Sequence, residues 1–134
     1  MGISWNYFKR YMINDDGFIE YLEGGTFGYV YGNSGLISEV LRRVGVDIPV
    51  YDVEPPSKDD LILVEPDKVR EGCDIIISML KKENNPILAD GENLFLEEDL
   101  NRQDVQQLHD FVLEEIRPIR KLSEQGYFIA TDFE

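Results

Sequence analysis

The chain contains one cysteine, Cys73, and one histidine, His109. A single cysteine cannot form an internal disulfide, and one cysteine with one histidine falls short of the usual ligand set of a zinc site. No group of His, Cys, Ser, Asp and Glu has the spacing of a known catalytic motif. The sequence therefore predicts no metal and no cofactor, offers no catalytic residue, and favours a role other than catalysis.

Long apolar runs are also missing. No hydrophobic stretch approaches the roughly 20 residues that a membrane-spanning helix needs. The first residues lack the succession of basic, apolar and small residues that marks a secretory signal. These observations predict a protein that works in the cytoplasm without a membrane partner.

Basic residues are scarce relative to acidic ones. The sequence has 13 Lys and Arg against 27 Asp and Glu, which gives a net charge of -14 on 134 residues. Such a charge repels nucleic-acid phosphates and anionic lipids, and it speeds association with basic proteins. We therefore expect a basic protein partner and no direct contact with nucleic acid. The alternative is that the carboxylates only keep the protein in solution.

Hydrophobic residues make up 43% of the chain, far above the level of disordered acidic proteins. No linker or repeat divides the sequence, so we predict one α+β domain over residues 1–134. We expect a mixed or antiparallel sheet with three to four helices packed on it. The predicted strands cover residues 3–12, 48–53, 61–64 and 127–133. The predicted helices cover residues 14–24, 34–44, 66–82 and about 101–125.

Several local signals support these elements. Pro66 is placed to begin a helix whose inward side carries an apolar stripe. The stripe consists of Val69, Cys73, Ile76, Ile77 and Leu80. Pro49 cannot donate a ladder hydrogen bond, which predicts an edge strand there. We expect the two terminal strands to pair within one sheet, and Pro118 to bend the last helix.

The run from Gly24 to Tyr31 is similar to the glycine-rich loop that covers the phosphates in protein kinases. Glu23 stands where that loop has its first glycine, and no lysine follows before Lys58. We therefore predict a turn or an aromatic-lined loop here and no phosphate site.

Carboxylates are concentrated in the second half of the chain, where Arg102 alone opposes nine acidic residues between Asp90 and Glu115. The spacing of a calcium-binding loop is absent around Gly91, so we predict an exposed acidic face without a metal. The predicted binding residues are Glu97, Glu98, Asp99, Asp110 and Glu114.

Two neighbouring features lie on the same predicted helix. His109 is expected on the polar face. Arg117, Arg120 and Lys121 form a basic group near the C-terminal end of the helix, where cations suit its dipole, and Glu114 can pair with Arg117. Anion binding is the alternative for this group.

The order of elements resembles that of the YfbM-like family of small bacterial proteins of unknown function. The likeness rests on the opening Met1-Gly2 and strand, the helix from Ser34 to Val44, the helix entry Val64-Glu65-Pro66-Asp67-Lys68-Val69, and the late helix running through Gly126 into a final strand. The resemblance implies an α+β fold and no established reaction, and it transfers no functional residue.

The leading hypothesis is an acidic interaction protein, an inhibitor or immunity protein that docks a basic partner such as a nuclease toxin. A nucleic-acid mimic is the second hypothesis, and regularly spaced carboxylates along one exposed stripe would favour it. A small enzyme is the third, and it would require a deep pocket with a buried carboxylate beside a tyrosine or His109. The sequence leaves the oligomeric state open.

Overall fold

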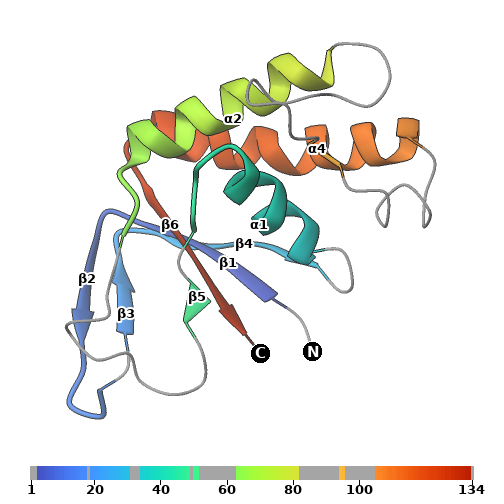
Figure 1. Cartoon of the computed structure of the whole chain (residues 1–134). Coiled ribbons are helices and arrows are strands. Elements are labelled where there is room, and N and C mark those ends of the chain that lie inside the picture. The colour runs from blue at the N-terminus through green and yellow to red at the C-terminus, as the bar shows by residue number, and fades with distance from the viewer. Residues whose placement is uncertain are drawn as a thin grey trace.

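A computed structural model describes residues 3–17, 19–30, 34–48, 50–51, 63–81, 94–95 and 105–133. Within them the strands are β1 (Ile3–Phe8), β2 (Arg10–Ile13), β3 (Ile19–Leu22), β4 (Gly25–Val30), β5 (Val50–Tyr51) and β6 (Phe128–Phe133). The helices are α1 (Ser34–Arg43), α2 (Pro66–Leu80) and α4 (Val105–Glu124). Figure 1 shows this α+β fold, which confirms the predicted fold class.

The main sheet has four strands in the order β4-β1-β6-β5. β1 pairs antiparallel with β4 and with β6, whereas β5 pairs parallel with β6. The terminal strands are therefore neighbours, with Ile3 opposite Phe133, as predicted. β5 lies at an edge, which agrees with the restriction that Pro49 imposes.

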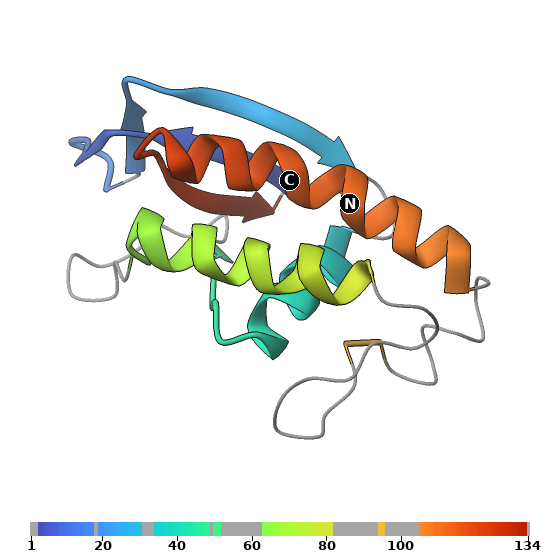
Figure 2. The ribbon, with the colours of Figure 1, turned by 90° about the horizontal axis from the view of Figure 1, so that it is seen from above.

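The helices bury their apolar faces against one side of the sheet. α2 and α4 lie side by side over much of their length (Figures 1 and 2), and α4 also contacts β6. In α2 the buried side chains include Val69, Cys73, Ile76 and Leu80, with Ile77 partly buried, so the predicted stripe is confirmed. Trp5 of β1 belongs to the same core.

The predicted first strand is interrupted, and the predicted helix over residues 14–24 is wrong. The strand is interrupted by a bend at Lys9, and β2 then forms a hairpin with β3, with Tyr11 opposite Tyr21. At the start of that predicted helix, the Asn14 Oδ1 accepts a hydrogen bond from the Asp16 N–H at 3.0 Å in the hairpin turn. Paired β-branched and aromatic side chains favour the hairpin over a helix of only two or three turns.

The expectation of a loop from Gly24 to Tyr31 is also wrong, because residues Gly25–Val30 form β4 along the edge of the main sheet. Pairing with β1 supplies the partners that this backbone needs, despite its glycines. Leu63 and Val64, part of the predicted strand 61–64, have no regular structure, and residues 61–62 lie outside the described residues.

Candidate functional site

The structure places two of the five predicted acidic residues. Asp110 and Glu114 are one turn apart on α4 and both are exposed. Glu97, Glu98 and Asp99 lie in residues 96–104, outside the described residues. α4 therefore holds one pair of the predicted carboxylates on a common face, because residues at i and i+4 of a helix are neighbours.

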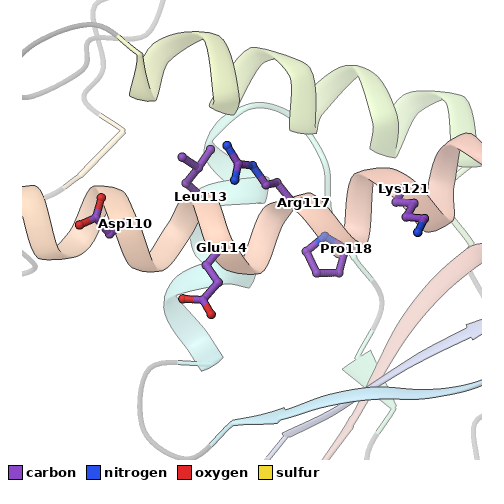
Figure 3. Close-up of a pocket in the computed structure, with 6 residues that line it drawn as sticks. All are labelled: Asp110, Leu113, Glu114, Arg117, Pro118 and Lys121. Atoms are coloured by element: carbon purple, nitrogen blue, oxygen red, sulfur yellow. The ribbon is translucent and has the colours of Figure 1, made fainter.

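This pair borders an open hollow of about 630 Å³ along the outer face of α4 (Figure 3). Among the described residues, those that line it are Asp110, Leu113, Glu114, Arg117, Pro118 and Lys121. The hollow thus has an acidic end, two apolar residues and a basic end. The opposite side of α4 carries the buried Leu108, Val112 and Ile119, so the hollow faces away from the core.

Ion pairing leaves most of these charges available. Asp110 accepts a hydrogen bond from the Gln106 amide at 2.9 Å. Among the described residues, Glu114, Arg117 and Lys121 have no ion-pair partner within 4.0 Å. The expected pair between Glu114 and Arg117 is therefore wrong, and Figure 3 shows why: the two side chains point to opposite borders of the hollow.

The basic group near the end of α4 is divided between two faces. Arg120 donates to Asp74 of α2 and pairs with Glu124 at 3.2 Å, so it fastens the two helices together. The hydrogen bond to the Asp74 carboxylate raises the pKa of Arg120. Arg117 and Lys121 remain in the hollow. The three cations thus do not form one anion-binding cluster. The side chain of Arg120 is directed toward α2, whereas those of Arg117 and Lys121 line the hollow.

Glu115, the next residue along α4 after Glu114, is half-buried. Burial raises its pKa, and the neighbouring charge of Glu114 adds to the rise. Neither carboxylate that lines the hollow is itself buried. Within the described part of its lining, the hollow therefore shows no desolvated acid of the kind that the hypothesis of a small enzyme requires.

His109 is buried, not on the polar face as the sequence predicted. Its side chain packs against Phe95, with ring centroids 5.6 Å apart, and its Nε2 has no hydrogen-bond partner. The Phe95 contact comes from a segment distant in sequence, which helical periodicity cannot reveal. In the part of the chain that the structure describes, no group of three or more His, Cys, Asp or Glu could hold a metal ion.

Cys73 is fully buried in α2. Burial raises the pKa of its thiol to about 12, and the carboxylate of Asp74 adds to the rise while Arg120 opposes it. Because the thiolate is the reactive form, this cysteine has a structural role in the core.

We expect Cys73 of the folded protein to react with Ellman's reagent at pH 8 about 10³-fold more slowly than in the unfolded chain, because its thiolate is disfavoured and inaccessible. Absorbance at 412 nm, followed with and without 8 M urea, measures both rates. Equal rates would contradict the assigned burial.

Among the described residues, no helix is long and apolar enough to cross a membrane. Comparison with family models, curated proteins and solved structures finds no match. The resemblance to the YfbM-like family accordingly stays a prediction, and the site rests on its own geometry.

Arg117 and Lys121 share a face with the acidic pair, which was not among the predictions from the sequence. The signal was present: positions 110, 114, 117 and 121 follow the 4-3-4 spacing of a single helix face.

Proposed function

We propose that this protein is an acidic interaction protein of the cytoplasm that docks a basic protein partner, as an inhibitor or immunity protein does. The observation that carries the proposal is the exposed pair Asp110 and Glu114 at the rim of an open hollow on α4. Glu97, Glu98 and Asp99 are proposed to extend the same acidic surface.

The chemistry of the hollow suits a protein ligand. Lys or Arg side chains of a partner can reach the carboxylates, while apolar side chains can cover Leu113 and Pro118. Protein interfaces commonly combine such an apolar centre with a charged rim. The net charge of -14 adds long-range attraction toward a basic partner.

The same residues argue against a nucleic-acid mimic. A mimic needs carboxylates in an unbroken track, like phosphates along a strand. On this face of α4, Arg117 and Lys121 follow the acidic pair and interrupt the track. A protein partner that places its cations at the acidic end meets no such obstacle.

The proposal predicts that the double variant Asp110→Lys/Glu114→Lys binds the basic partner more weakly than the wild-type protein does. Immobilised wild-type protein should capture a basic protein from the source lysate at low salt and release it at high salt. With that partner identified by mass spectrometry, we expect the double variant to slow its association about tenfold or more at physiological ionic strength. Surface plasmon resonance measures the rates.

Asp67→Lys/Glu71→Lys is the matched control, because these two exposed acids have the same i, i+4 spacing on α2 and the same charge change. The control should slow association much less than the α4 variant. If the association rate falls equally in both variants, the effect is due to net charge and not to the site on α4. An unchanged association rate in the α4 variant would contradict the proposed site. Circular dichroism verifies that each variant is folded.

A further inference from the structure

The charges along the hollow on α4 complement those of a second copy of the same helix that runs in the opposite direction. Its six lining residues within the described part of the chain are arranged symmetrically about the midpoint between Glu115 and Ile116. At equal distances from that midpoint, Asp110 mirrors Lys121 and Glu114 mirrors Arg117. The remaining two, Leu113 and Pro118, mirror each other and are both non-polar. Every acid therefore has a base as its counterpart.

Within one chain these counterparts do not meet. Asp110 and Lys121 are 11 residues apart, which is about 16 Å along a helix, and Glu114 and Arg117 point to opposite borders of the hollow (Figure 3). Glu114, Arg117 and Lys121 have no ion-pair partner among the described residues. Complementary charges are thus displayed and left unpaired.

We propose that the hollow binds α4 of a second copy of this chain, with the two helices antiparallel about a two-fold axis. A two-fold axis through the midpoint reverses the second helix, so each residue lies level with its mirror counterpart. Asp110 then pairs with Lys121 of the second copy and Glu114 with Arg117, while Leu113 and Pro118 flank these contacts on opposite borders. By symmetry each contact forms twice, as in the two-fold interfaces that most homodimers use.

The geometry of α4 permits this approach. Its buried residues, such as Val112 and Ile119, face the core, and the hollow occupies the opposite side. The 4-3-4 spacing of the charged residues is the spacing at which antiparallel helices pack side by side with a shallow crossing angle. The second helix can therefore lie along the hollow without displacing the core.

The expected dimer is weak. One helix face is smaller than the roughly 800 Å² per partner of a standard stable interface. Two copies also repel each other at long range through their net charges of -14. At physiological salt this repulsion is screened beyond about 8 Å, while charges in contact still interact. Dimerisation is therefore to be measured at physiological salt and high protein concentration.

This inference goes beyond the proposed docking of a basic protein and is tested without it. Because the second copy would cover Asp110 and Glu114, dimerisation and partner binding exclude each other. A failure to dimerise leaves the proposed partner site intact. Conversely, failure to capture a basic partner leaves the dimer standing.

Sedimentation equilibrium of the purified chain, up to about 1 mM, tests the dimer. We expect Glu114→Arg and Arg117→Glu each to raise the dimer dissociation constant about tenfold or more, because each places like charges at two symmetric contacts. The double variant Glu114→Arg/Arg117→Glu should restore dimerisation, and so should mixing the two single variants. In both cases every charged contact again joins opposite charges.

The controls Glu71→Arg and Lys68→Glu change net charge by the same amounts at exposed positions of α2 and should leave dimerisation near the wild-type level. A wild-type chain that stays monomeric at about 1 mM would overturn the proposal. So would a dimer that the single reversals leave unchanged, or single variants that neither the double variant nor the mixture rescues. Circular dichroism confirms that each variant is folded. The mixing experiment combines the same two single-variant proteins and requires no further substitution.

Discussion

The Gly24→Ala variant is expected to lose about 4 kcal/mol of its unfolding free energy or to fail to fold. A Cβ atom at this position would lie 1.8 Å from the Tyr7 carbonyl oxygen and 2.7 Å from the Phe8 Cα. Both atoms belong to the backbone of β1, which pairs with β4 and β6. Relief of the clash therefore requires movement of a central strand and disturbs both ladders.

Urea denaturation followed by circular dichroism measures this loss. Gly25→Ala is the matched control, because its Cβ would meet only the tip of the Tyr7 side chain, at 3.1 Å from the hydroxyl oxygen. That side chain can turn aside, so we expect a change within about 1 kcal/mol. Similar stabilities of the two alanine variants would contradict the close approach at Gly24.

The second large effect is expected from Ile76→Ala, which should destabilise the fold by about 2–5 kcal/mol. Ile76 is fully buried at the centre of the α2 stripe, where it joins the core shared with α4 and the sheet. Shortening it removes buried methyl groups and leaves a cavity that the surrounding side chains can fill only in part.

Ile75→Ala is the control for this substitution. Ile75 is the adjacent residue on the same helix, but 47% of its surface is exposed. The same change in side chain should therefore alter stability by less than about 1 kcal/mol, since alanine also has the better helix propensity. If both variants unfold at the same urea concentration, the orientation of α2 is wrong.

The elements that the sequence predicted well are those with strong local signals. Pro66 at the start of α2 and its apolar stripe defined a helix that the structure confirms, and the helix predicted over residues 34–44 is α1. When apolar residues recur every 3.6 residues over several turns, a helix is the structure that fits, because only a helix brings those side chains to one face.

The hairpin and β4 were predicted wrongly because their signals are short and their stability comes from pairing. Ile19 and Leu22 have a spacing that suits one helical turn, yet β3 is held by its cross-strand partners in β2. The glycines of β4 are typical of a loop, but pairing with β1 holds this segment as an edge strand. The stability of a strand comes from its contacts and hydrogen bonds with a partner strand, so the propensity of the single segment does not reveal it.

For the candidate site, the sequence by itself determined the charge, the helical phase of positions 110, 114, 117 and 121, and the identity of Asp110 and Glu114 as exposed carboxylates. Only the tertiary structure decided that Arg120 turns to Asp74 on α2 while Arg117 and Lys121 remain in the hollow, and that His109 is buried against Phe95. Periodicity depends on the geometry of one helix, whereas burial and ion pairing depend on which other element packs against it.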